Sequence, residues 1–219
     1  MKRFLKALGL GAAISLFWVS PVNAAPTQVL QSNFIAEAFW GITDTPALRH
    51  GVDVRVFQSK SGPAVLNASD TTTQFEENGD IAHTDVTRIE NVSSGFTFTR
   101  QQPLKGATLS GQNSATAAVI PATRCTTDYV FGEPDRDTRE CTETTVTLRI
   151  NWVGEGETSR DVFTFHLGPP IVPEAILNEY EITFVRQATA TGTFNVPLGT
   201  ADHAVLGTDR NGAICVKCP

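Results

Sequence analysis

The chain has little of what catalysis usually requires. It contains no His-Glu-x-x-His motif, no Gly-x-Ser-x-Gly motif and no phosphate-binding loop, and its four histidines show no close metal-ligand spacing. Metal-dependent and nucleophilic hydrolases place their reactive groups in such patterns because those groups must converge on one substrate atom. The sequence therefore predicts no catalytic residue, no metal-ligand set and no cofactor.

Basic residues are also scarce. Lysine and arginine number 17 against 23 aspartates and glutamates, which gives a net charge of −6 at pH 7. No cluster of basic residues with interleaved aromatics occurs anywhere in the chain. An acidic surface repels phosphate groups, so the composition excludes nucleic acid as a partner.

Helical periodicity is missing, and alternation takes its place. The stretch Thr145–Val153 puts Val146, Leu148, Ile150 and Trp152 on one face and polar residues on the other, as in a half-buried strand. The same pattern occurs at 52–56, 96–99, 163–167 and 180–184, and glycine or proline interrupts it at 61–63, 78–79, 154–156 and 168–170. We predict an all-β fold, a single antiparallel β-sandwich of about eight to ten short strands. The one helix candidate is short, at 173–179.

The N-terminus has the three parts of a secretory signal peptide. Lys2, Arg3 and Lys6 precede an apolar run of about 12 residues, too short for the roughly 20 that span a bilayer. Small residues before Ala25 form a cleavage site, and no second apolar segment of spanning length follows. We expect a signal peptide at 1–24 of bacterial type, a β-sandwich domain at 25–205 and a C-terminal tail at 206–219. The mature chain should be exported, to the periplasm or the medium, without a membrane span.

All four cysteines fall in the exported part, where an oxidising compartment favours disulfides. Cys125 and Cys141 flank a loop between two predicted strands, and we favour pairing them across its base. Cys215 and Cys218 form a Cys-x-x-Cys close enough to pair with each other, and pairing between tail and loop remains the alternative. A redox site would need a helix after the first cysteine, and a zinc site would need two close pairs, so neither is favoured.

The loop between Cys125 and Cys141 is rich in charge. Asp135, Arg136, Asp137 and Arg139 form a candidate binding loop, because exposed loops on rigid scaffolds often carry function. The alternative is a solvated turn whose charges contribute little. A second acidic segment, 76–80 with Asp85 beyond it, offers oxygen ligands for calcium but lacks the spacing of an EF-hand loop.

Three segments resemble a loose set of uncharacterised exported bacterial β-domain proteins. They are 107–111 (ATLSG), 145–156 (TVTLRINWVGEG) and 186–192 (RQATATG), similar in order and spacing over roughly residues 105–195. The resemblance implies an exported β-domain and attaches no activity to it. It also makes the charged cysteine loop an insertion, which favours a local or accessory role.

Together these patterns favour an exported, non-enzymatic β-sandwich that acts as a binding or structural module, with an unknown ligand and a partner in the envelope or outside the cell. The alternatives are an exported hydrolase of polysaccharides or esters and a calcium-binding module. Trp40 and Trp152 would provide a sugar-stacking surface only if exposed, and the alternation places Trp152 in the core.

Overall fold

The computed structural model describes residues 29–59, 62–100, 112–167 and 176–217, which form ten β-strands and one 3-10 turn. The strands are β1 (Val29–Asp44), β2 (Leu48–Ser59), β3 (Ala64–Phe75), β4 (Ile81–Val92), β5 (Thr97–Arg100), β6 (Gln112–Asp128), β7 (Thr138–Leu167), β8 (Ile176–Phe194), β9 (Val196–Thr200) and β10 (His203–Lys217). The 3-10 turn, η1, covers Pro134–Arg136 between β6 and β7. The predicted signal peptide, the 107–111 segment and Cys218 lie outside the described residues.

All the strands belong to one antiparallel sheet. Its order is β10-β1-β2-β3-β4-β6-β7-β8-β9, and β5 pairs with β6. β10 pairs with β8 as well as with β1. Hydrogen-bonded neighbours therefore lead from β10 through β1 and the following strands to β8 and from there back to β10. The predicted all-β antiparallel fold is confirmed.

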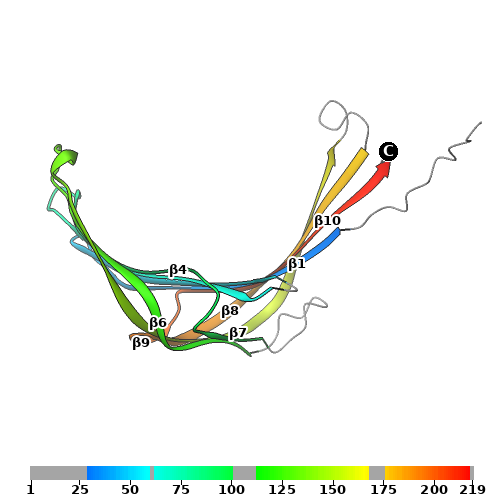
Figure 1. Ribbon diagram of the computed structural model, residues 1–219, viewed down its shortest axis with the longest axis horizontal. Helices are drawn as coiled ribbons and strands as arrows, with labels where there is room; N and C mark the ends of the chain where they lie inside the picture. Colours follow the sequence, from blue (N-terminus) through cyan, green and yellow to red (C-terminus); the bar gives the residue numbers. More distant parts are fainter. Residues whose placement is uncertain (1–28, 60–61, 101–111, 168–175, 218–219) are drawn as a thin grey trace, which may run out of the picture.

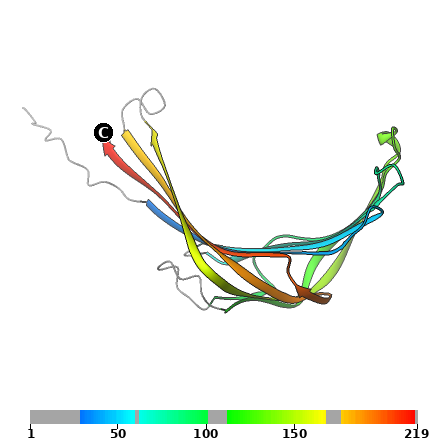
Figure 2. The same cartoon turned by 180° about the vertical axis from the view of Figure 1, so that it is seen from behind.

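The middle of the molecule has two layers that enclose the core. Figure 1 shows β1 and β4 in one layer and β6 to β9 in the other, and Figure 2 shows the same layers from behind. Buried side chains from both layers form one hydrophobic core, with Val54 and Leu66 on one side and Leu148 and Ile150 on the other. The two layers match the predicted sandwich, but hydrogen bonds continue from one layer into the next instead of leaving two separate sheets.

The alternation predicted for residues 145–153 is confirmed by burial. Val146, Leu148, Ile150 and Trp152 are buried, at 1% exposure or less. Opposite Ile150 lies Gly192, where an added Cβ would sit 1.9 Å from the carbonyl oxygen of Arg149. Only glycine fits at this point of the β7–β8 pair.

Several strands are longer than predicted. β7 continues through the predicted break at 154–156, because a bulge between Gly154 and Thr158 absorbs extra residues without ending the pairing. The helix predicted at 173–179 is wrong over 176–179, which begin β8, while 173–175 lie outside the described residues. The tail predicted at 206–219 is instead strand as far as Lys217. Both segments have a strand on each side, and this pairing outweighs local propensity.

Two arms extend from the layered middle and bend to the same side (Figure 1). One arm carries the ends of β7 and β10 and the beginnings of β1 and β8. The other carries the β6–β7 hairpin with its 3-10 turn, and the β3–β4 turn. This second arm, which we call the hairpin arm, contains the cysteine loop and most of the charged contacts described below.

Candidate functional site

On the hairpin arm, the face of the sheet that covers the core changes from apolar to polar. Every second residue of β2, β4 and β7 points to this face of the sheet. Val52, Ile89 and Val146 are buried there, and the residues at the same spacing along each strand toward the hairpin arm are polar. These residues border a hollow of about 290 Å³. Its lining consists of His50, Asp70, Thr72, Asp85, Thr87, Arg124, Thr144 and Asn195.

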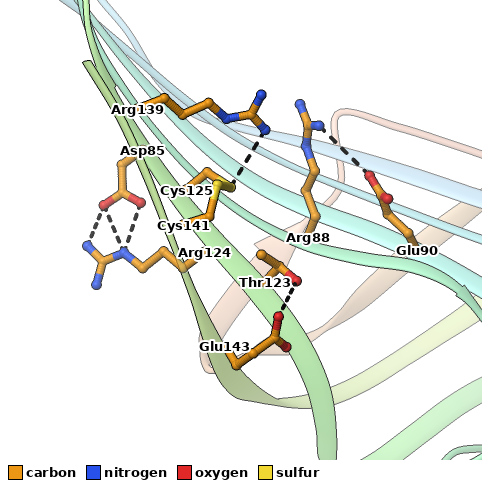
Figure 3. Close-up of a disulfide and its surroundings, with 9 residues drawn as sticks. All are labelled: Asp85, Arg88, Glu90, Thr123, Arg124, Cys125, Arg139, Cys141 and Glu143. Atoms are coloured by element: carbon orange, nitrogen blue, oxygen red, sulfur yellow. Dashed lines mark hydrogen bonds and ion pairs between the residues drawn. A yellow bond between two sulfur atoms is a disulfide. The ribbon is translucent and has the colours of Figure 1, made fainter.

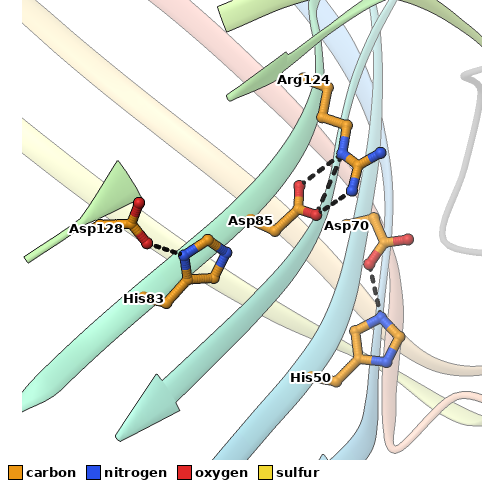
Figure 4. Close-up of polar contacts among 6 residues, drawn as sticks. All are labelled: His50, Asp70, His83, Asp85, Arg124 and Asp128. Carbon is orange, nitrogen blue, oxygen red and sulfur yellow. Dashed lines mark hydrogen bonds and ion pairs between the residues drawn. The ribbon is translucent and has the colours of Figure 1, made fainter. Parts of the chain in front are cut away.

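Asp85 and Arg124 make a two-pronged ion pair across β4 and β6 (Figure 4). The guanidinium Nε donates to both carboxylate oxygens, at 2.9 and 3.2 Å, and an NH2 nitrogen donates to Oδ2 as well. The hydrogen bond from Arg124 holds the pKa of Asp85 below its ordinary value, and the same contact raises the pKa of Arg124. The pair therefore fixes the position of charge beside the hollow.

Two histidines of this face are each paired with an aspartate (Figure 4). His50 Nε2 lies 2.7 Å from Asp70 Oδ1, and His83 Nδ1 lies 2.6 Å from Asp128 Oδ1. The contact with His83 lowers the pKa of Asp128. His83 meets Asp128 because the β4–β6 register places the two residues opposite each other, which no local sequence pattern shows.

A histidine oriented by a carboxylate is a component of many hydrolytic sites, where a hydroxyl or thiol contacts the other imidazole nitrogen. Among the described residues, the imidazole of His50 hydrogen-bonds to Asp70 and that of His83 to Asp128. These contacts join neighbouring strands and position charge, and within the described part of the chain no hydroxyl or thiol hydrogen-bonds to either imidazole.

The ion pair of Asp85 should make the unfolding free energy depend on pH. Because its folded pKa is below the unfolded value, its contribution to stability is present above pH 4 and is lost as pH falls through the folded pKa. We expect Asp85→Asn to lower the unfolding free energy at pH 7 by about 1 kcal/mol, and by less at pH 3, in urea melts. The exposed Asp135→Asn is the control and should change neither value. Equal losses from Asp85→Asn at both pH values would contradict an ionic role.

The opposite face of the β6–β7 hairpin carries the disulfide (Figure 3). Cys125 and Cys141 are bonded and lie directly opposite each other in the strand register, so this predicted pairing is confirmed. The disulfide was predicted at the base of the loop. It lies within the paired part of the hairpin instead, because β6 and β7 continue beyond it to Asp128 and Thr138. Hydrogen bonds of the ladder extend the hairpin past its covalent link.

Arg139, predicted as part of the binding loop, belongs to β7. Its guanidinium contacts Cys125 Sγ at 3.7 Å (Figure 3). It borders a hollow of about 310 Å³ together with Arg88, Glu90 and Glu143. The structure therefore separates Arg139 from the other three loop residues.

The remaining loop residues lie in the turn between β6 and β7. Arg136 pairs with Glu133 at 2.9 Å, and Asp137 Oδ1 accepts a hydrogen bond from the backbone N–H of Val130 at 2.9 Å. Asp135 and Arg136 are in η1, and Asp137 follows it. These contacts hold the turn in one shape, and all three side chains are exposed.

The end of the hairpin is apolar as well as charged. Tyr129 and Val130 are each 39% exposed and Phe131 is 77% exposed. The backbone N–H of Tyr129 donates to Ala82 at 2.9 Å, which brings the hairpin beside Ile81, itself 44% exposed. We call these four residues, Ile81, Tyr129, Val130 and Phe131, the apolar tip. The sequence signal for it is the run Tyr129-Val130-Phe131, which precedes the charged residues of the candidate binding loop.

Comparison of the chain with protein families, with characterised proteins and with solved structures found no match.

The remaining site predictions involve metals, the second cysteine pair and the membrane. Asp85 of the calcium candidate binds Arg124, and Asn78 and Asp80 hydrogen-bond to each other in a tight turn. Among the residues that the structure describes, no group of three or more histidines, cysteines or acids could hold a metal ion. Cys215 lies in β10 opposite Leu177, and Cys218 lies outside the described residues, so the pairing of these two cysteines stays a prediction. Within the same residues, no helix is long and apolar enough to cross a membrane.

Proposed function

We propose that the protein is an exported, non-enzymatic binding module that contacts a protein partner of the envelope or medium through the apolar tip. The observation that carries the proposal is the exposure of Phe131, at 77%, at the end of a disulfide-linked hairpin. An exposed cluster of large apolar side chains on a folded protein marks a site of interaction.

The composition of the hairpin end resembles that of protein interfaces. Such interfaces have an apolar, often aromatic centre surrounded by polar and charged residues. Here Tyr129 and Phe131 are the aromatic residues, and Glu133, Asp135 and Arg136 lie beside them in the turn. The charges predicted to form a binding loop would then surround the contact and favour partners of complementary charge.

The hairpin arm holds the apolar tip in a restricted position. The disulfide links the two strands, and three further residue pairs of the β6–β7 ladder follow it, the last being Asp128 with Thr138. The Asp85–Arg124 ion pair joins the same hairpin to β4. Association with a partner therefore costs less ordering of the tip than association through a free loop would.

Export is part of the proposal. The N-terminal sequence has the parts of a secretory signal peptide, and the Cys125–Cys141 disulfide is of the kind that persists in an oxidising compartment. Both features are consistent with the periplasm or the medium.

Replacing Phe131 by serine should abolish capture of the partner without changing stability. Purified mature protein, immobilised and exposed to the native envelope fraction and medium, should retain a partner that Phe131→Ser does not. We expect the unfolding free energy of this variant to stay within about 0.5 kcal/mol of the original, because the side chain is exposed. Val119→Ser is the matched control, since Val119 is 61% exposed on another part of β6.

A second variant tests the charges of the candidate binding loop. Replacing Asp135, Arg136, Asp137 and Arg139 together by serine should change stability by less than about 1 kcal/mol and weaken capture. Partners retained equally by the original protein, Phe131→Ser and Val119→Ser would contradict the apolar tip as the contact. A large loss of stability in the charge variant would show that the turn is packed into the domain.

A further inference from the structure

A second surface lies on the outer face of β1, β2 and β3, opposite the core. The side chains there alternate with the buried Ala38, Val52 and Ala68, so they point away from the core. They border a hollow of about 480 Å³, within the size range of small-ligand sites. Its principal residues are Phe39, Gly41, Gly51, Asp53, Thr71 and Asp202.

A pair of glycines forms the floor of this hollow. Gly41 and Gly51 are directly opposite each other on β1 and β2. A Cβ added to Gly51 would lie 3.1 Å from Phe39 Cε2, and one added to Gly41 would lie 3.6 Å from Phe39 Cε1. The Phe39 ring thus lies against the glycine pair, in the place that two side chains would otherwise occupy. It remains 44% exposed, so part of the ring is open to solvent.

A carboxylate stands beside this ring. Asp53 is the direct cross-strand partner of Phe39, and Ser69 follows on β3. Among the described residues Asp53 makes no ion pair, since the nearby Arg55 pairs with Glu37 at 2.7 Å. The side chain reaches solvent, yet the surrounding protein partly desolvates its carboxyl and raises its pKa. Its oxygens are available to accept hydrogen bonds from a ligand.

Further polar groups line the hollow. Asp202 enters from the turn between β9 and β10, and its Oδ2 accepts a hydrogen bond from the N–H of Gly41 at 2.5 Å. Thr71 lies opposite Gly51, and Thr73 lies opposite Arg49. The hydroxyl groups donate and accept, the carboxylates accept, and the guanidinium donates.

We propose that this hollow binds a saccharide, with one face of a sugar ring against Phe39 and its hydroxyls hydrogen-bonded to Asp53, Asp202 and the threonines. A pyranose ring has apolar C–H faces and a polar edge, so it needs a flat aromatic surface with hydrogen-bonding groups around it. The site is separate from the apolar tip and adds a second ligand class to the proposed binding function.

The same groups argue against an organic cation as the occupant. Asp53 and Asp202 would attract a cation, but the guanidinium of Arg49 borders the same hollow and is paired with Asp44 at 3.0 Å. The hydroxyls of Ser69, Thr71 and Thr73 have no hydrogen-bonding counterpart in a quaternary ammonium group, whereas a polyhydroxylated ring both donates to them and accepts from them.

The test uses the mature protein and a defined set of probes. Glucose, galactose, mannose, N-acetylglucosamine and their linear oligosaccharides of two to six units are titrated by calorimetry and by NMR shift mapping, with tetramethylammonium as the cationic probe. We expect at least one saccharide series to bind, with shifts at Phe39 and Gly51. Affinity should fall at least tenfold in Phe39→Ala and in Asp53→Asn and should be kept in Phe39→Tyr.

Phe131→Ser serves as the control, since it removes the apolar tip and should leave saccharide affinity unchanged. Asp53→Asn retains the size of the side chain, so its effect can be read even if Phe39→Ala does not fold. Binding by no member of the set at millimolar concentration would overturn the proposal. So would equal binding by the original protein and Asp53→Asn, or binding of tetramethylammonium alone. Loss of saccharide binding in Phe131→Ser would place the site at the hairpin instead.

Discussion

Replacing Trp152 by alanine should lower the unfolding free energy by about 3 to 5 kcal/mol, the largest effect we expect from one substitution. Trp152 is fully buried between the two layers, and its indole Nε1 donates to the carbonyl oxygen of Glu37 at 3.0 Å. The side chain therefore links β7 of one layer to β1 of the other. Truncation leaves a cavity and an unpaired carbonyl at the same point.

Urea melts followed by circular dichroism measure this loss. Trp152→Phe keeps most of the volume and removes the hydrogen bond together with part of the indole ring, so it should cost less, about 1 to 3 kcal/mol. Trp40, which is also buried and donates to Gly199 at 3.0 Å, remains as a fluorescent reporter in both variants. A loss below 1 kcal/mol for Trp152→Ala would contradict the close packing of the two layers.

Replacing Cys125 and Cys141 by serine should lower the unfolding free energy by about 3 kcal/mol. The disulfide joins residues with a sequence separation of 16 and restricts the conformations of the unfolded chain. Without it, the unfolded chain has a higher entropy and is therefore more favourable relative to the folded state. The folded hairpin has ladder hydrogen bonds on both sides of the bridge, so we expect the fold to survive. Melts of the original protein with and without a reducing agent should show the same difference.

The control for this experiment is the neighbouring cross-strand pair. Thr126 and Glu140 lie opposite each other one step closer to the turn, and replacing both by alanine should cost less than about 1 kcal/mol. If reduction leaves the melting curve unchanged, the bridge does not restrain the unfolded chain in the manner expected.

The fold could be predicted where local pattern and final environment agree. Residues 145–153 alternate without interruption, and the structure buries one set of side chains and leaves the other exposed or, at Asn151, half-buried. The pairing of Cys125 with Cys141 was predictable because hairpin strands place such residues opposite each other. Neither inference required knowledge of distant contacts.

Predictions failed where distant partners decide the local structure. The glycines at 154–156 look like a chain break, but β8 continues to pair on both sides of the bulge and holds β7 together. Residues 176–179 and the segment after 205 are strands because β10 and β8 pair with each other. No local pattern shows that the sheet returns to its starting strand.

The candidate sites were predictable only in part. The cysteine loop was identified, but Arg139 was assigned to it although register places this residue in the ladder. The exposure of Phe131 could not be predicted, because an apolar residue in a turn has no alternating neighbours that show whether its side chain is buried. Trp40 was considered as a sugar surface and is buried, and the alternation that buries it turns Phe39 outward.

The pairing of β1 with β10 has a consequence for the order of folding. Val29 lies opposite Ala213, so β1 and β10 pair through residues that are far apart in the chain. Such contacts require the entropy of a long loop to be lost before they form, and they make folding slow. β10 follows every other described strand in the sequence, so the complete sheet cannot assemble around a partial chain. The export proposed above would benefit from this delay, because a chain that is still unfolded can pass through a narrow translocation channel and form its complete sheet only after β10 has followed.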